Sequence, residues 1–450
     1  MNNEDMKIEL TPEVGVEFEE YKNKFLWDNY CKETMDNIKV IENSVLSLNI
    51  QFPNGTAAKD YQFELKIDTE IIEDYWFEGL DAVGLSEQRR DDCSIISGSP
   101  LAAGDYKVEM WYKYKGWIDG KPTLSRTFTI TINPDPKSLW RDLPTPTDIE
   151  YFKEDYATDY VEVNDDKGLS QKDIVAASKR GRSHAHDGKA RDDDFSLKYC
   201  EDSGWYIIAV ADGAGSALFS REGSRIACAS SVRHCTERLA AVSDFDNNII
   251  ELNNHGSESE YRKRVADNIY EIVGNAAFKA HRAVLEEAQS KERAVKTYST
   301  TLLLSICKRF EFGWFVASFW VGDGAMAIYD KDNSYIKLLG KPDGGEYAGQ
   351  TRFLTMPDIF KDVESIYSRL RYSIEKDFTA LFVMSDGVSD PMFETDANLE
   401  RVAKWDELWV NINSEVELID NNRESQYQLA KWLDFWSAGN HDDRTIAILY

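Results

Sequence analysis

The sequence lacks the features that place a protein in or across a membrane. It has no apolar run long enough to span a bilayer. Its first residues, MNNEDMKIELTPEVG, lack the basic segment followed by an apolar segment that a secretory signal requires. We therefore expect a cytoplasmic protein without a membrane partner.

Cysteine is sparse, and its spacing argues against the usual cysteine-based sites. No two cysteines form a Cys-x-x-Cys pair, and the six are scattered along the chain: Cys31, Cys93, Cys200, Cys228, Cys235 and Cys307. Such usage is typical of reduced thiols in a cytoplasm rather than of a disulfide framework or a zinc site.

Positive charge is also scarce. The chain has 52 Lys and Arg against 80 Asp and Glu, a formal net charge of -28. Nucleic acids and anionic membranes are bound through basic surfaces, so we expect neither as a partner. The hydrophobic fraction of 42% and the aromatic fraction of 12% indicate a globular chain with a substantial core.

The pattern along the 450 residues predicts four segments. Residues 1–40 are charged and have a helical pattern. Residues 41–134 contain alternating runs such as YKVEMWYKY between turn signals, which predict a small antiparallel β-sandwich. The run NPDPKSLWRDLPTPTD marks a linker over residues 135–172. In residues 173–450, strand-like runs and two long helical patterns predict a layered α/β domain with sheet in the middle.

Aspartates stand at the ends of three apolar runs in this last segment, each followed by glycine: Asp212, Asp323 and Asp386. Singly, each is best explained as a turn, because Asp bonds its own backbone and Gly accepts a positive φ. Further acidic residues flank neighbouring runs, namely Asp192–Asp194, Asp390, Asp442 and Asp443. If these strands lie side by side, several carboxylates gather at one end of a sheet, where unpaired charge is costly.

A hard divalent cation would neutralise such a group. Oxygen ligands select Mg²⁺ or Mn²⁺, whereas zinc and copper prefer Cys or His. Two ions about 3.5–4 Å apart can share a water, lower its pKa and present it to a phosphorus centre. Glycine after each Asp would let the backbone approach the ions closely. The pattern therefore favours metal-assisted phosphate hydrolysis.

Six motifs follow one another in the sequence: DDDF, VADGAGSA, YSTTLL, VGDGAMAIY, MSDGVSD and HDDRTIAIL. Their order and spacing, over roughly residues 175–450, resemble the metal-dependent protein serine/threonine phosphatases of the PPM family (type 2C). ADGAGS and GGEYAGQTRFLT resemble its bacterial branch. The resemblance implies a central β-sandwich flanked by helices. The preceding run with ISGSPLAAGDYKVEM resembles bacterial immunoglobulin-like modules, so we expect a small all-β immunoglobulin-like sandwich before the α/β domain.

By position, the resemblance implies a centre of two, and with a weaker site three, Mg²⁺ or Mn²⁺ ions. Asp212 would bridge two ions, and the carbonyl of Gly213 would bind one of them. Asp386 and Asp442 would hold the same pair, while Asp323 would share a third ion with Asp386. A water between the ions would attack phosphorus directly, without a phosphoenzyme.

Other positions match supporting parts of the family. Asp193 matches the acidic residue of the first motif, which binds metal through water or stands behind the ligands. Asp390 would orient nearby waters. Thr300 and Thr301 match a structural turn on a core strand, and residues 341–372 fall where the family carries a mobile flap that selects substrates.

Three positions depart from the family pattern. Gly188 stands where many members have a phosphate-binding Arg, Ala214 where some have a His proposed as general acid, and Asp443 where Asn is usual. The residues that could replace the arginine are Arg182, His184, Lys189 and Arg191. We favour Arg182, because GRSH opens the approach to the first motif and a guanidinium grips phosphate in bidentate fashion.

The resemblance thus predicts hydrolysis of phosphoserine and phosphothreonine in proteins, with Asp212, Asp386 and Arg182 as catalytic residues. The expected partners are a phosphorylated protein and a cognate serine/threonine kinase. Two alternatives stay open. The departures favour a phosphatase-like module that binds phosphoproteins or a kinase with little or no turnover. The other alternative is a phosphohydrolase of nucleotides or small phosphoesters.

Overall fold

The computed structural model divides the chain into two compact units, Met1–Leu139 and Trp140–Tyr450. The described residues are 12–47, 50–66, 72–90, 93–115, 123–165, 168–256, 259–343 and 351–450. The first eleven residues of the predicted N-terminal helical segment therefore lie outside the described residues, as do residues 344–350 of the expected flap.

In the first unit, two sheets share one hydrophobic core. The alternating run YKVEMWYKY lies in β6 (Gly104–Tyr114), whose Val108, Met110 and Tyr112 are buried in that core. The sheets have the orders β1-β7-β6-β3 and β2-β5-β4. The remaining elements are β1 (Gly55–Thr56), β2 (Tyr61–Leu65), β3 (Ile72–Glu78), α2 (Leu80–Val83), β4 (Leu85–Arg89), β5 (Ser94–Gly98), β7 (Leu124–Asn133) and a 3-10 turn at Pro136–Leu139. The immunoglobulin-like character of this unit stays a prediction.

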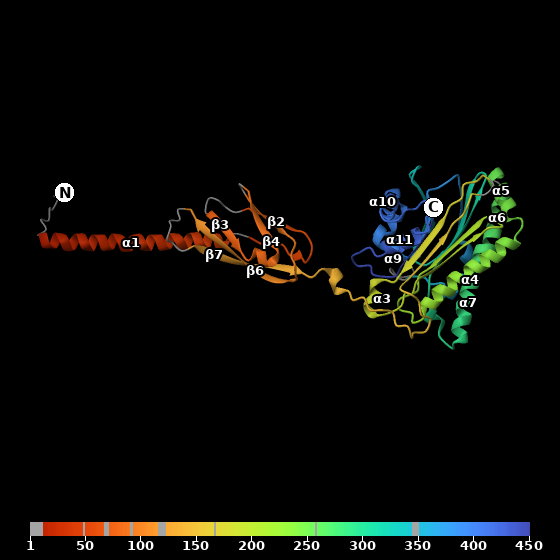
Figure 1. Ribbon diagram of the computed structural model, residues 1–450, viewed down its shortest axis with the longest axis horizontal. Helices are drawn as coiled ribbons and strands as arrows, with labels where there is room; N and C mark the ends of the chain where they lie inside the picture. The colour runs from red at the N-terminus through yellow and green to blue at the C-terminus, as the bar shows by residue number, and fades with distance from the viewer. Residues whose placement is uncertain are drawn as a thin grey trace, which may run out of the picture. The chain divides into compact units, whose positions relative to one another are not determined.

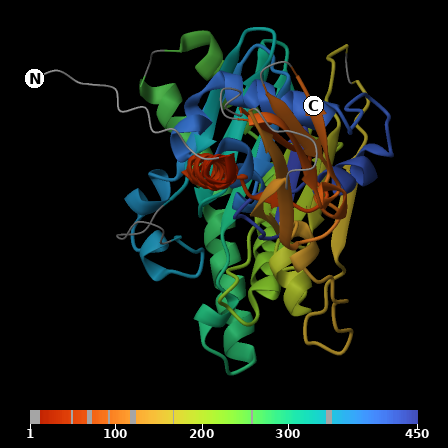
Figure 2. The ribbon, with the colours of Figure 1, turned by 90° about the vertical axis from the view of Figure 1, so that its left-hand side faces the viewer.

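A single helix of 36 residues, α1 (Pro12–Ser47), precedes these strands (Figure 1) and is seen end on in Figure 2. Ile41, near its C-terminal end, packs against the core of the two sheets. Toward its start, Phe18, Tyr21 and Trp27 are each more than half exposed. In the parts of the chain that the structure describes, no helix combines the length and the apolar character that a membrane span requires.

Two antiparallel sheets pack face to face in the second unit. Their strand orders are β10-β11-β12-β13-β16 and β15-β14-β17-β18-β9-β8. Ile208 and Val210 of β11 lie in the core between the sheets, whereas Ile207 and Ala209 face the helices outside. Both faces of β11 are therefore buried, which is why its sequence is a continuous apolar run. The strands are β8 (Tyr156–Val161), β9 (Ile174–Lys179), β10 (Asp194–Cys200), β11 (Trp205–Ala211), β12 (Leu302–Phe310), β13 (Gly313–Val321), β14 (Ala325–Asp330), β15 (Tyr335–Gly340), β16 (Leu370–Glu375), β17 (Ala380–Met384) and β18 (Arg444–Leu449).

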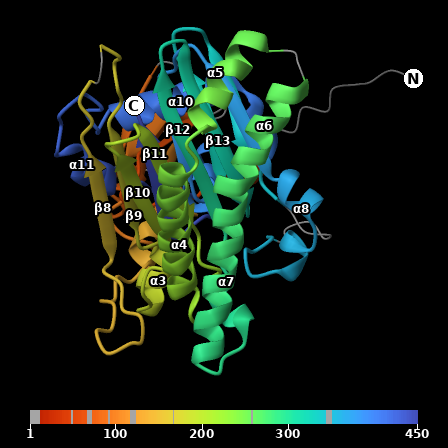
Figure 3. The same cartoon turned by 90° about the vertical axis from the view of Figure 1, so that its right-hand side faces the viewer.

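Helices cover the outer face of each sheet. Figure 3 shows α4 and α7 side by side across the five-stranded sheet, and α9, α10 and α11 pack on the six-stranded sheet. A π-helical turn at Tyr270–Gly274 joins α6 to α7. The helices are α3 (Arg182–Asp187), α4 (Ser220–Ala241), α5 (Phe245–His255), α6 (Ser259–Ile269), α7 (Asn275–Ser290), α8 (Val363–Tyr367), α9 (Asp386–Phe393), α10 (Val402–Asn413) and α11 (Ser425–Trp432). The predicted mixed α/β layering, with sheet in the middle, is confirmed.

The predicted linker over residues 135–172 is wrong in part. Its segment Tyr156–Val161 forms β8, which pairs antiparallel with β9 at the edge of the six-stranded sheet. The acidic sequence of this segment is typical of a surface connector because an edge strand keeps polar residues on its solvated face. The hydroxyl of Tyr160 anchors this strand by donating to the carboxylate of Asp173.

Candidate metal centre

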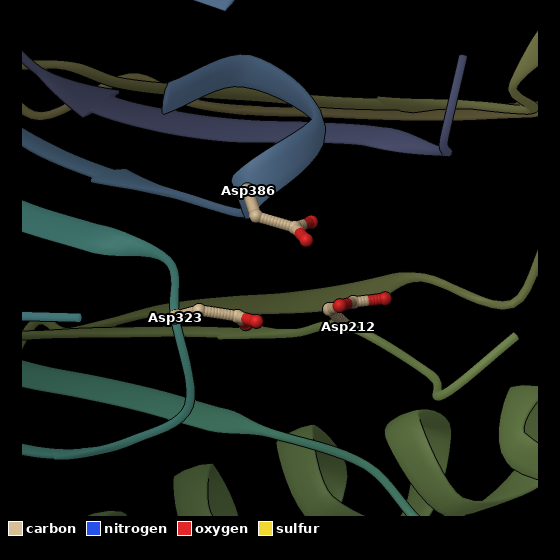
Figure 4. A group of neighbouring side chains, drawn as sticks. All are labelled: Asp212, Asp323 and Asp386. Atoms are coloured by element: carbon tan, nitrogen blue, oxygen red, sulfur yellow. The ribbon is translucent and has the colours of Figure 1, made fainter. Parts of the chain in front are cut away.

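Three chain segments bring Asp212, Asp323 and Asp386 together. Asp212 follows β11, Asp323 lies between β13 and β14, and Asp386 opens α9 directly after β17. Because β11 and β17 belong to facing sheets, the group forms where the ends of the two sheets meet. One carboxylate oxygen of each residue lies within 4.8 Å of the others. Figure 4 shows the three side chains directed into one space.

Lack of space, rather than a turn, requires the glycines that follow these aspartates. A Cβ added to Gly213 would lie 2.6 Å from the carbonyl oxygen of Asp192. A Cβ added to Gly387 would lie 1.9 Å from the carbonyl oxygen of Asp443. Neither glycine has a positive φ. The turn explanation is therefore wrong at these positions, where the backbone packs tightly against two other acidic segments.

Burial and mutual repulsion make the three-aspartate group electrostatically costly. Burial, followed by the charges of Asp386 and Asp193, raises the pKa of Asp212 well above its usual range. Burial and the charges of Asp323 and Asp193 do the same to the pKa of Asp386. Among the described residues, no Lys or Arg forms an ion pair with any of the three aspartates. A bound divalent cation would relieve this repulsion.

The donor atoms suit a hard cation. The group contains carboxylate oxygens and, within the described part of the chain, no Cys or His. Oδ1 of Asp323 is buried and has no hydrogen-bond partner, while its Oδ2 accepts a hydrogen bond from the hydroxyl of Thr351. Sites made of oxygen atoms select Mg²⁺ or Mn²⁺ over zinc and copper. The residues therefore fit the predicted metals.

Asp193 lies fully buried behind the group. Its Oδ2 accepts hydrogen bonds from Ser385 Oγ at 2.9 Å and Thr445 Oγ1 at 2.7 Å, whereas its Oδ1 has no partner. Burial, and then the charge of Asp443, raises the pKa of Asp193 to about 6. Because Ser385 immediately precedes Asp386, the bond from Ser385 also fixes the strand end that carries Asp386.

Thr300 and Thr301 fix the backbone of Asp212. The N–H of Asp212 donates to Thr301 Oγ1 at 2.8 Å, and Thr300 Oγ1 donates to the Asp212 carbonyl at 2.9 Å. The N–H of Thr301 donates to the same carbonyl at 2.8 Å. These bonds give the two threonines the supporting position that the resemblance implies.

Asp442 stands farther out than the other predicted ligands. It is exposed, and it is not one of the three residues whose carboxylates lie within 4.8 Å of one another. Its charge nevertheless contributes to the raised pKa of Asp386. The next residue, Asp443, is buried. Two adjacent aspartates before β18 therefore have different surroundings.

Asp443 forms an ion pair with His184, a contact that no local motif of the sequence indicates. His184 Nδ1 lies 3.0 Å from both carboxylate oxygens of Asp443, which also accept hydrogen bonds from the N–H groups of Gly181 and Asp192. Burial alone would lower the pKa of His184, but the charges of Asp443 and Asp192 raise it to about 9. A protonated His184 therefore neutralises the aspartate found where the family usually has Asn.

Arg182 is engaged away from the aspartate group. Its Nη2 donates to the Asp434 carbonyl at 3.1 Å and to Asp434 Oδ1 at 3.2 Å. Its guanidinium carbon lies 5.4 Å from the centre of the Trp436 ring. Among the described contacts, none joins Arg182 to Asp212, Asp323 or Asp386. The expected role of Arg182 in binding phosphate therefore stays a prediction that none of the described contacts supports.

A cavity of about 370 Å³ adjoins Asp192 and the loop after Asp212, and two cationic residues line it, Lys189 and Arg221. The other lining residues are Ile149, Gly188, Ala190, Asp192, Gly215, Ser216, Ala217 and Leu218. Arg191, another residue considered for phosphate binding, is buried and donates to the Ser178 hydroxyl and to the Asp193 carbonyl. Of the four residues considered, Lys189 therefore has the position best suited to meet an anion.

Comparison with family models matches residues 180–434 of the chain to the model described as Protein phosphatase 2C. Comparison with curated proteins gives no match. Among solved structures, the serine-threonine phosphatase 2C from Toxoplasma gondii is 12% identical, with 65% of this chain and 98% of that chain covered and a TM-score of 0.40. The serine/threonine phosphatase of S. agalactiae is 14% identical, with 62% of this chain and 99% of that chain covered and a TM-score of 0.38. The serine/threonine phosphatase PstP/Ppp of Mycobacterium tuberculosis is 13% identical, with 62% and 98% covered and a TM-score of 0.36.

Proposed function

The chain belongs to the protein phosphatase 2C family, and from this premise we propose that it hydrolyses phosphoserine and phosphothreonine in proteins with the help of Mg²⁺ or Mn²⁺. The observation that carries the proposal is the group formed by Asp212, Asp323 and Asp386. These three half-buried carboxylates lie within 4.8 Å of one another, the pKa values of Asp212 and Asp386 are raised, and none of the three has a cationic partner among the described residues, so a bound cation would stabilise the group.

Asp212, Asp386 and Asp442, with the carbonyl of Gly213, would hold two ions, and Asp323 would complete a third site with Asp386. When bound, the ions supply a water of lowered pKa and screen the charge of the phosphate from the aspartates. Asp193 acts from behind, where its bonds keep the end of β17 in position.

Lys189 and Arg221 are the side chains that we propose for phosphate orientation. Arg221 is held by hydrogen bonds from Nε to the Tyr151 carbonyl at 3.0 Å and from Nη2 to the Glu150 carbonyl at 2.9 Å. Its Nη1 lies 3.8 Å from Asp192 Oδ1 at the cavity wall. The ammonium of Lys189 forms an exposed ion pair with Asp187, with Nζ 3.1 Å from Oδ2. Because exposed ion pairs are weak, Lys189 can exchange Asp187 for the phosphate and, with the fixed guanidinium of Arg221, compensate the charge of a phosphate dianion.

Asp390 lies one helical turn after Asp386 on α9, at the edge of the group. Burial, followed by the charge of Asp323, raises the pKa of Asp390 to about 6. We propose that it accepts hydrogen bonds from waters around the reacting phosphate. Ala214 has no proton to give, so the serine or threonine alkoxide that leaves phosphorus would take its proton from a water or from another group of the site.

The test is release of phosphate from a phosphothreonine peptide and from p-nitrophenyl phosphate, measured with Mn²⁺, with Mg²⁺ and with EDTA. We expect turnover only with a divalent ion and a loss of at least about 100-fold in Asp386→Asn, since a ligand shared by two sites is removed. Asp332→Asn makes the same change in charge at an exposed position of the β14–β15 hairpin and serves as the matched control. Equal rates in EDTA and in Mn²⁺ would contradict the proposal.

The absent arginine and histidine at Gly188 and Ala214 favour one second candidate, a module that binds phosphoproteins without turnover. That candidate predicts Mn²⁺ binding by calorimetry, and capture of a phosphopeptide, with no phosphate released. Hydrolysis of the phosphothreonine peptide rules it out.

A further inference from the structure

A second, larger cavity adjoins Asp390 and Asp442. Its volume is about 820 Å³, and it shares Asp390 and Asp442 with the proposed centre. Its other lining residues include Pro391, Met392, Glu394, Asn411, Phe435 and Asn440. The cavity is thus formed by the end of α9, by α10 and by the loop that precedes β18. A group bound in it would lie next to the proposed reaction site.

The loop wall of this cavity is held in one conformation from behind. Arg444 Nη1 donates to the Leu433 carbonyl at 2.8 Å and also to the Phe435 carbonyl, and its Nη2 donates to Ser437 Oγ at 2.9 Å. The guanidinium carbon lies 3.8 Å from the centre of the Phe435 ring. Ser437 Oγ in turn donates to the carbonyl of Asn440 at 2.6 Å. The loop is therefore a built wall of the cavity rather than a loose segment.

All charged residues that line the cavity are acidic. Asp390, Glu394 and Asp442 contribute carboxylates, and no Lys, Arg or His is among the lining residues. In the described part of the chain, none of these three carboxylates has an ion-pair partner. Oδ1 of Asn440 is buried and also lacks a hydrogen-bond partner. The three carboxylates of the wall therefore lack a donor, and the proposed ions would account for Asp442 alone.

The backbone at Glu394 keeps its carboxylate at the cavity. Glu394 has a φ of 64°, in the left-handed region, and the N–H of Thr395 donates to the Phe393 carbonyl at 2.7 Å across it. This three-residue turn ends α9 abruptly and leaves Glu394 exposed. Pro391, Met392 and Phe435 supply apolar surface on the same walls.

We propose that this cavity receives an arginine or lysine side chain of the phosphoprotein substrate, from a position close to the phosphorylated residue. The inference rests on the proposed phosphatase function and deepens it. A basic side chain matches both parts of the wall, because its alkyl stem packs on apolar surface while its charged end donates to carboxylates. Because Asp390 and Asp442 belong to both sites, the basic residue lies within about four positions of the phosphothreonine, a span of about 14 Å in an extended chain.

The test compares kcat/KM for matched phosphothreonine peptides that carry Arg, Ala or Glu at each of the neighbouring positions. We expect one position at which Arg is preferred over Ala by about fivefold, with Glu poorer than Ala, and a preference that shrinks in 1 M salt. Glu394→Gln should reduce the preference for peptides with Arg. Glu394→Lys should reverse the preference, so that peptides with Glu at that position react faster than peptides with Arg. Glu424→Gln, at an exposed position on the N-terminal side of α11, is the matched control and should keep the wild-type preference.

Hydrolysis of p-nitrophenyl phosphate distinguishes the phosphatase function from the selection of a basic residue by the cavity. This substrate has no side chain to place in the cavity, so its turnover reports the phosphatase function alone. If it is hydrolysed but Arg, Ala and Glu peptides react equally at every position, the cavity proposal is overturned while the function stands. If Glu394→Lys keeps the Arg preference, the cavity is not the selecting site.

Discussion

Replacement of Gly387 by alanine should destabilise the second unit, although helix propensity alone predicts the opposite. Gly387 is the second residue of α9 and does not have a positive φ. In an ordinary helix, Gly→Ala is expected to stabilise by about 1 kcal/mol. Here the new Cβ would lie 1.9 Å from the Asp443 carbonyl oxygen and 2.9 Å from the Asp443 carbonyl carbon. Those atoms belong to backbone and cannot turn away as a side chain would.

The expected loss of stability in Gly387→Ala follows from the distance by which two backbone segments must separate. Ordinary Cβ contacts begin at 3.4 Å, so α9 and the start of β18 would have to separate by about 1.5 Å. Overpacking of this kind costs about 1–3 kcal/mol and outweighs the gain in propensity. The same displacement would move Asp386, which is adjacent in the chain, and would weaken Mn²⁺ binding by about tenfold or more.

Chemical denaturation and Mn²⁺ calorimetry of Gly387→Ala would measure both effects. Gly215→Ala is the stability control, because a Cβ at Gly215 meets nothing within 4 Å and its φ is not positive. We expect this control to be neutral or stabilised by about 0.4–1 kcal/mol. If Gly387→Ala is as stable as the wild-type protein and binds Mn²⁺ equally well, the close approach of α9 to Asp443 is refuted.

Three further predictions concern the metal centre, the buried ion pair and the thiols. In EDTA, Asp386→Asn should unfold at a higher temperature than the wild-type protein because one repelling carboxylate is gone; in Mn²⁺ the order should reverse, and an unchanged order in thermal scans would contradict the electrostatic argument. His184→Ala should cost about 3–5 kcal/mol of unfolding free energy, since it leaves Asp443 buried without its partner, and Asp443→Asn should restore part of that loss in the double variant. With a thiol reagent under native conditions, Cys31 should react first, because burial raises the pKa of Cys228, Cys235 and Cys307; fast modification of any of these three would show that the core opens.

The sequence predicted those parts of the site that depend on local pattern. Asp212, Asp323 and Asp386 each follow a buried apolar strand, so their position at a sheet end could be read from neighbouring residues. The reason for the glycines that follow could not be predicted in this way. Gly387 is required because the backbone of Asp443, which is distant in the chain, leaves no room for a Cβ. The pair Asp-Gly is compatible both with a turn and with a close approach of two backbone segments, so the sequence alone does not distinguish them.

Long-range pairs account for the other differences. His184 and Asp443 are 259 residues apart, and Arg182 and Asp434 are 252 residues apart, so no local motif contains either contact. Arg182 is close to the first motif in the chain, but no residue near it in the sequence indicates Asp434 as its partner. The sequence does not predict strand β8 for a different reason: an edge strand with a solvated face has the polar composition of a connector.

Whether the three aspartates bind metal can be observed in crystals soaked in Mn²⁺ and measured at the manganese absorption edge. We expect anomalous peaks in the space bounded by Asp212, Asp323 and Asp386, and their loss in Asp386→Asn. Manganese found elsewhere, with the three carboxylates bonded to protein groups or to water alone, would contradict the assignment of this group as the metal centre.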